Sequence, residues 1–100
     1  MQLVIESPGL PTDDNLEILI RSKFDDLEKI YGRMTSALVV LRKENDDRKK
    51  YFHIEARLSV PQKTLFAKEQ AETFEKALHK MMDDLTHQLH RFKDEREEVR

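Results

Sequence analysis

The segment YFHIEARLSV, residues 51–60, decides the fold because its side chains alternate strictly between apolar and polar. A repeat of two residues places the two sets on opposite faces of a β-strand. One face is then buried and the other solvated, which is typical of an antiparallel sheet. Every other element must pair with this strand or cover its apolar face. The apolar set is Phe52, Ile54, Ala56, Leu58 and Val60, and the polar set is His53, Glu55, Arg57 and Ser59.

Two more strands are expected before this segment. Residues 2–6 contain Leu-Val-Ile and are followed by Ser7-Pro8-Gly9, which is turn chemistry. Residues 35–43 contain the β-rich run Leu-Val-Val-Leu, and the polar residues 44–50 after it are expected to form a loop. A helix separates these two strands, and a strand–helix–strand crossover normally joins parallel neighbours. We therefore expect the first two strands to pair in parallel.

The first helix is predicted from apolar residues that recur at three- and four-residue steps. It opens at residues 11–14, where Thr12 or Asp13 can cap the free amide groups and the acidic first turn suits the helix dipole. Gly32 is expected to end it as a left-handed cap. The predicted apolar stripe is Leu16, Leu19, Ile20, Phe24, Leu27, Ile30 and Tyr31.

The C-terminal half predicts a turn, a strand and a second helix. Residues 61–63 turn the chain, and residues 64–69 return as a fourth strand with Leu65 and Ala67 facing inward. A helix is expected from about Thr73 to about Asp94, with a frayed tail over residues 95–100. Its predicted apolar stripe is Phe74, Leu78, Met81, Leu85, Leu89 and Phe92.

The element order is therefore β-α-β-β-β-α within a single domain, residues 1–100. Two amphipathic helices must bury their stripes, and a sheet with one apolar face offers the place. The prediction is an α+β fold: a two-layer sandwich with a four-stranded sheet and two helices on one face.

Composition limits the function classes. There are no cysteines, which excludes disulfides, thiolate metal sites and cysteine nucleophiles. No apolar run approaches the roughly 20 residues of a membrane span, and the N-terminus lacks a signal-peptide layout, so a cytoplasmic protein is expected. With 18 Lys and Arg against 20 Asp and Glu, the total charge does not indicate nucleic-acid binding. Such binding would need local clusters of positive charge.

The order of elements and several motifs together resemble the ribosome hibernation-promoting factor family, also called ribosome-associated inhibitor or σ54-modulation protein. The resemblance covers nearly the whole chain. Its sharpest part is V-P-x-K-x-L-F-A-K-x-Q-A-x-T-F-E-x-A over residues 60–77, followed by D-L-x-x-Q-L-x-x-x-K over residues 84–93. The start Met1-Gln2-Leu3 and the block K-F-x-x-L-E-K over residues 23–29 also match.

The resemblance implies a fold akin to double-stranded-RNA-binding domains. It also implies binding to the small ribosomal subunit, with its 16S-type rRNA, between head and body where mRNA and tRNA lie. Such binding blocks translation in stationary or starved cells. Because the chain ends at Arg100, we expect the short type, without the C-terminal domain by which long members pair two ribosomes.

The expected RNA-binding residues are cations on the outer faces of the helices. Lys23, Lys29, His87 and Arg91 match basic positions of the family. Lys80, His87 and Arg91 follow at steps of seven and four residues, one polar stripe opposite the apolar one. Lys93 lies close to them in the sequence. If the helices lie side by side, their outer stripes are expected to form one positive surface able to meet phosphates.

Two acidic residues weaken this expectation. Asp26 and Asp84 stand where relatives typically carry Lys, and each replacement changes the local charge by two units. Lys and Arg on the outside of a helix are also most often simply solvated. Binding through residues 48–50 (Arg-Lys-Lys) and the strand residues Arg57 and Lys68 is therefore a second possibility.

Other chemistry is not favoured. Asp83 and His87 are four residues apart and His87 and His90 are three apart, so either pair has helical spacing for a surface metal site. Neither pair has a third ligand fixed by the fold. The serines have no nearby His/Asp arrangement, and two glycines do not make a phosphate-binding loop. We expect no enzyme, no cofactor and no metal. The alternative to ribosome binding is a non-catalytic protein-interaction module on the same fold, with the open sheet face or a helix face as its surface.

Overall fold

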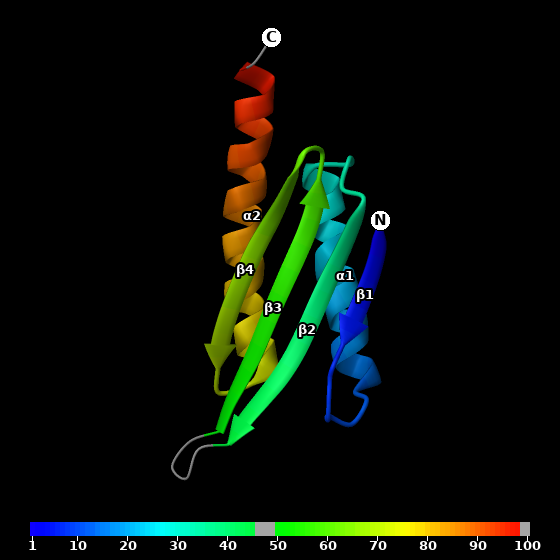
Figure 1. Ribbon diagram of the computed structural model, residues 1–100, viewed down its shortest axis with the longest axis vertical. Helices are drawn as coiled ribbons and strands as arrows, with labels where there is room; N and C mark the ends of the chain where they lie inside the picture. Colours follow the sequence, from blue (N-terminus) through cyan, green and yellow to red (C-terminus); the bar gives the residue numbers. More distant parts are fainter. Residues whose placement is uncertain (46–49, 99–100) are drawn as a thin grey trace.

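The computed structural model describes residues 1–45 and 50–98. The elements follow in the order predicted from the sequence, β-α-β-β-β-α. The strands form one sheet, and both helices lie behind it in Figure 1, so that the sheet has one covered and one open face. The bounds are β1 Gln2–Glu6, α1 Asp14–Ile30, β2 Ser36–Asn45, β3 Lys50–Val60, β4 Lys63–Ala71 and α2 Phe74–Glu98.

The sheet has the strand order β1-β2-β3-β4. The predicted parallel pairing of β1 with β2 is confirmed, and both β2–β3 and β3–β4 are antiparallel. β3 is thus a central strand, and its predicted alternation is confirmed because Ile54, Ala56, Leu58 and Val60 are all buried. The short β1 and the longer β4 are the edges.

The hairpin of β2 and β3 extends further than predicted. Glu44 pairs with Tyr51 and Asn45 pairs with Lys50, so β2 continues two residues past the expected end at Lys43. Polar side chains are tolerated there because the paired strands continue beyond the apolar part of the sheet. The remaining loop residues of the prediction, 46–49, lie outside the described residues.

The turn between β3 and β4 has two residues outside the pairing, Pro61 and Gln62. Val60 pairs with Lys63 across it. Gln62 has a φ of 68°, in the left-handed region that few non-glycine residues adopt. A proline followed by a residue with positive φ is typical of a type II turn, which requires a positive φ at its second central residue. The Arg96 guanidinium donates to the Gln62 side-chain oxygen at 3.3 Å and so connects α2 to this turn.

Helix α1 begins as predicted but ends differently. The Asp13 side chain caps the helix by accepting from the Leu16 amide at 3.1 Å. The expected left-handed cap at Gly32 is wrong, because Tyr31 ends the helix in an extended conformation and the positive-φ glycine is Gly9. The Tyr31 amide still donates to the Leu27 carbonyl, so no left-handed residue is needed to close the helix.

The core lies between the covered sheet face and the two helices. The stripes predicted for both helices supply it: Leu16, Ile20, Phe24 and Leu27 from α1, and Leu78, Met81, Leu85, Leu89 and Phe92 from α2, are buried. Ala77 and Met82 of α2 are buried as well, which widens its apolar face. Burial of these side chains stabilises the fold by about 25 cal/mol for each Å² of apolar surface removed from water.

Helix α2 runs to Glu98, past the predicted end near Asp94. Its C-terminal turns extend beyond the end of the sheet in Figure 1. Two ring contacts support this part. Tyr31 meets Phe92 edge to face at 5.6 Å between ring centroids, and the Arg96 guanidinium lies 5.4 Å from the Phe92 centroid. Residues 99–100 of the predicted tail lie outside the described residues.

Candidate functional site

One hollow lies on the covered side of the sheet, between the beginning of α1 and Phe74 of α2. Its volume is about 820 Å³. Leu41, Phe52 and Phe74 contribute apolar surface, and Phe52 meets Phe74 edge to face at 4.8 Å. The lining of this hollow contains one cation, Lys43, and three carboxylates, those of Asp13, Asp14 and Glu17. This excess of acid disfavours phosphate binding in the hollow.

A second, smaller hollow of about 180 Å³ lies between the two helices. Lys23 and Asp26 line it from α1, and His79 and Asp83 line it from α2. One lysine and two aspartates line this groove, so its lining lacks the net positive charge that phosphate contacts require.

Lys29 forms an ion pair with Asp26, one turn before it on α1. Its ammonium lies 3.6 Å from the Asp26 carboxylate, with both side chains largely exposed. Such an exposed pair contributes little stability, but it reduces the positive field of Lys29 toward an approaching phosphate.

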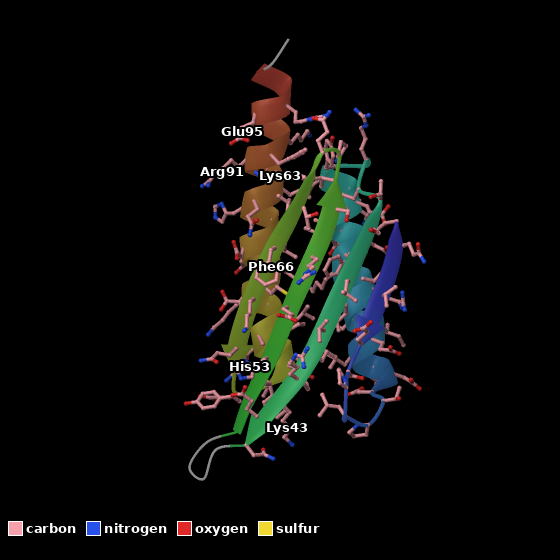
Figure 2. The ribbon with its side chains drawn as sticks, viewed as in Figure 1. Lys43, His53, Lys63, Phe66, Arg91 and Glu95 are labelled. Carbon is pink, nitrogen blue, oxygen red and sulfur yellow. The ribbon has the colours of Figure 1, made fainter. Side chains whose placement is uncertain are left out.

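Three of the other predicted cations, Lys80, His87 and Arg91, lie on the far side of α2, along the edge strand β4. The Lys80 ammonium donates to the Gln70 carbonyl at 3.4 Å, and the Gln88 side-chain amide donates to the Phe66 carbonyl at 2.8 Å. Arg91 follows Lys80 by eleven residues, close to three helical turns, and therefore lies on the same side. Figure 2 shows Arg91 projecting from the side of α2 opposite to α1.

These residues define what we call the β4-edge stripe: Lys80, His87 and Arg91, which are all exposed. Asp84 belongs to the same side of α2, but it is half-buried and its carboxylate accepts from the Gln88 amide at 3.1 Å. The three residues of the stripe therefore lie along one exposed side of α2, where Asp84 interrupts the row of cations.

The structure does not bring all six predicted residues into one positive surface. Lys23 lies in the groove between the helices, and Lys93 lies eleven residues after Met82, which lines that groove. The β4-edge stripe points away from the groove. The expectation of a single surface was wrong because α2 turns Lys80 and Arg91 toward β4, where Lys80 contacts the strand.

The open sheet face carries the residues of the second possibility, Arg57 and Lys68. The strand register places Val4, Leu38, Arg57 and Phe66 in one row across the sheet. Val4 is 43% exposed and Phe66 is 47% exposed. Of residues 48–50, Arg48 and Lys49 lie outside the described residues.

Sequence reasoning missed Phe66 as a surface residue. The signal was present, because Phe66 lies between the inward-facing Leu65 and Ala67 and strand alternation turns it outward. His53, on the same face, places its Nε2 3.4 Å from a Glu44 carboxylate oxygen in β2. His53 therefore lies beside an acidic side chain of the neighbouring strand.

Within the described part of the chain, no three His, Asp or Glu side chains are grouped to hold a metal ion. No helix within residues 1–45 and 50–98 is long and apolar enough to cross a membrane.

Two solved structures share the fold. A ribosomal subunit interface protein from Coxiella burnetii has a TM-score of 0.82 at 16% identity, with 94% of this chain and 99% of that chain covered. The Protein Y N-terminal domain from Thermus thermophilus has a TM-score of 0.79 at 20% identity, with 92% and 99% covered. At these identities the likeness concerns the fold.

The sequence itself gives the family. No curated protein sequence matches the chain. Residues 3–97, however, match the family described as sigma 54 modulation protein / S30EA ribosomal protein. The match includes all or nearly all of every helix and strand, in agreement with the resemblance seen in the sequence. The chain belongs to the sigma 54 modulation protein / S30EA ribosomal protein family.

Proposed function

We propose that this protein binds the small ribosomal subunit and inhibits translation by occupying the channel through which mRNA and tRNA pass. The family match over residues 3–97 carries the proposal. The name of the Coxiella burnetii structure, a ribosomal subunit interface protein, supports it.

The proposed mechanism is occlusion by a folded body. The chain is elongated, with extents of 54 × 24 × 19 Å. A body of this size excludes other ligands from a groove without making or breaking a bond. Contacts between lysine or arginine and phosphate release counterions from RNA, so the affinity falls as salt rises.

The proposed RNA-binding residues are the six cations Lys23, Lys29, Lys80, His87, Arg91 and Lys93. They form two groups, which we expect to contribute unequally. Of the first group (Lys23, Lys29 and Lys93), Lys23 shares the groove with Asp26 and Asp83, and Lys29 is paired with Asp26. In the second group, the β4-edge stripe, the neighbouring acid Asp84 is held by Gln88. Arg91 therefore offers the better phosphate contact.

Co-sedimentation with purified small subunits tests the proposal. The wild-type protein is expected to pellet with the subunit at low salt and to be released as salt rises. Arg91→Glu is expected to weaken this binding while the fold is retained, since exposed helix positions usually change stability by less than about 0.5 kcal/mol. Lys29→Glu, which makes the same charge change at an exposed position of α1, is the matched control and is expected to weaken binding less.

Two outcomes oppose the proposal. Absence of the wild-type protein from the subunit pellet at low salt contradicts ribosome binding. An unfolded Arg91→Glu protein, detected by circular dichroism, shows that Arg91 supports the fold and removes it from the contact surface. Competition with an mRNA fragment then tests the channel itself, because occlusion predicts that mRNA and protein exclude one another.

The exposure of Val4 and Phe66 on the open face favours one alternative, a protein-interaction module. Apolar side chains exposed on one open face suit contacts with a protein partner. This alternative predicts binding that persists at high salt and a partner other than RNA.

A further inference from the structure

We infer that Phe66 and Arg57, on the open sheet face, form a platform on which an unpaired base of small-subunit rRNA stacks while its backbone follows the β4-edge stripe. The inference rests on the proposed function and adds to it a second contact surface and a preference for single-stranded RNA.

The aromatic ring of Phe66 is available for such a contact. Of the other phenylalanines, Phe24 is fully buried, and Phe52, Phe74 and Phe92 are held in edge-to-face pairs. Among the described residues, the ring pairs and the cation–ring contacts do not include Phe66. An unpaired ring that is 47% exposed on a sheet presents a flat apolar surface to solvent.

The surroundings of Phe66 suit a nucleotide. Arg57 is exposed and lies directly opposite Phe66 on β3. No acid lies in their row, and the nearest one along β3, Glu55, faces Lys68 on β4. A cation beside an aromatic ring matches a nucleotide, which joins a flat base to an anionic phosphate.

The platform is continuous with the proposed phosphate contacts. Gln88 donates to the main-chain carbonyl of Phe66 and thereby fixes α2 against β4 at this residue. His87 precedes Gln88 and Arg91 follows one turn later, so the β4-edge stripe passes beside the platform. Figure 2 shows Phe66 on the sheet with Arg91 on the adjoining flank of α2.

Stacking requires bases that are not already stacked in a duplex. Proteins that read single-stranded RNA commonly place aromatic side chains of a sheet under splayed bases and track the backbone with cations. An open sheet face with one exposed ring and an adjacent arginine has this arrangement. The preferred occupant is therefore an unpaired segment of ribosomal RNA and not a helix of it.

A tryptophan reporter tests the inference directly. The chain contains no tryptophan, so Phe66→Trp places a single tryptophan on the platform, whose fluorescence can be excited apart from that of the tyrosines. Stacking of a base is expected to quench its fluorescence when a single-stranded RNA of mixed sequence is added. The same RNA annealed to its complement is expected to quench less. Ile18→Trp, at a position 66% exposed on α1, is the matched control and should respond to neither RNA.

Binding measurements separate stacking from apolar contact. Phe66→Leu keeps apolar surface but removes the aromatic face, so affinity for a labelled single-stranded RNA is expected to fall by about 5- to 150-fold. Phe66→Tyr is expected to restore it. Arg57→Gln is expected to weaken binding and to flatten its salt dependence.

The two proposals fail in different ways. Equal binding of the wild type and Phe66→Leu to the small subunit, or equal quenching by single- and double-stranded RNA, overturns the platform and leaves ribosome binding intact. Quenching by single-stranded RNA without wild-type co-sedimentation refutes the proposed function instead. A protein that dimerises through this face, with self-association lost in Phe66→Leu by analytical ultracentrifugation, also overturns the platform.

Discussion

The Gln88 side-chain amide on α2 donates to the main-chain carbonyl of Phe66 on β4 at 2.8 Å. Lys80 reaches the Gln70 carbonyl on the same strand. At the other edge of the sheet, Arg21 of α1 donates to the Leu3 carbonyl of β1 at 3.4 Å. Each edge strand thus receives hydrogen bonds from the helix behind it. Such contacts occupy groups that would otherwise pair with a strand of another molecule.

Replacement of Gln88 by leucine should lower the free energy of unfolding by about 0.5–1.5 kcal/mol. The side chain keeps a similar size, but the Phe66 carbonyl and the Asp84 carboxylate lose their donor. Urea denaturation measures the change. Gln88→Glu, which retains acceptors only, should be at least as destabilising at neutral pH, because its carboxylate faces both oxygens. Unchanged stability in both variants would show that the bond contributes nothing.

Leu85→Ala should lower the free energy of unfolding by about 2–5 kcal/mol. Leu85 is fully buried in the stripe of α2, so the shorter side chain leaves a cavity. Thermal or urea denaturation gives the value. Ile18→Ala is the control, since Ile18 is 66% exposed and the change should stay within about 0.5 kcal/mol. Similar costs at the two positions would contradict the assigned face of the helix.

Tyr31 and Phe92 should be energetically coupled. Their rings meet edge to face where α1 ends and α2 continues beyond the sheet. A double-mutant cycle with Tyr31→Leu and Phe92→Leu is expected to give a coupling of about 0.5–1.5 kcal/mol. Additive single effects would indicate that the C-terminal turns of α2 are not held by this pair.

Gln62→Gly should raise the free energy of unfolding by up to about 1 kcal/mol. The residue has a φ of 68°, which glycine adopts without the steric cost borne by a side chain. Gln62→Val should instead destabilise the protein, because a branched side chain is least tolerated there. Denaturant titrations of both variants give the comparison. A stabilising valine would be incompatible with the positive φ.

Asp26→Lys should strengthen binding to the small subunit and keep it to higher salt. The change removes the carboxylate that pairs with Lys29 and adds two units of positive charge beside the groove. Salt titration of co-sedimentation measures it. Asp25→Lys makes the same charge change at an exposed neighbouring position outside the groove. Equal gains from both variants would mean that only total charge matters, and no gain from Asp26→Lys would remove the groove from the contact surface.

The sequence by itself determined the order of elements and their inward faces. Alternation in residues 51–60 placed Ile54 and Leu58 in the core, and the three- and four-residue steps placed Phe24 and Leu85 there. These patterns are local, because the pitch of a strand or helix fixes which residues share a face. The ends of the strands and the end of α1 at Tyr31 were harder to predict from the sequence, because cross-strand pairing and contacts with distant residues set them.

Only the tertiary structure decided which charges lie together. Lys23 and Arg91 were expected to share one positive surface, yet α2 packs so that Arg91 follows β4 while Lys23 faces Asp83 across the groove. The rotation of a helix about its axis depends on the side chains that it buries, such as Met82, and on bonds such as that from Gln88 to Phe66. Helical spacing gives the neighbours along one helix, but the partner across a gap depends on how the elements pack.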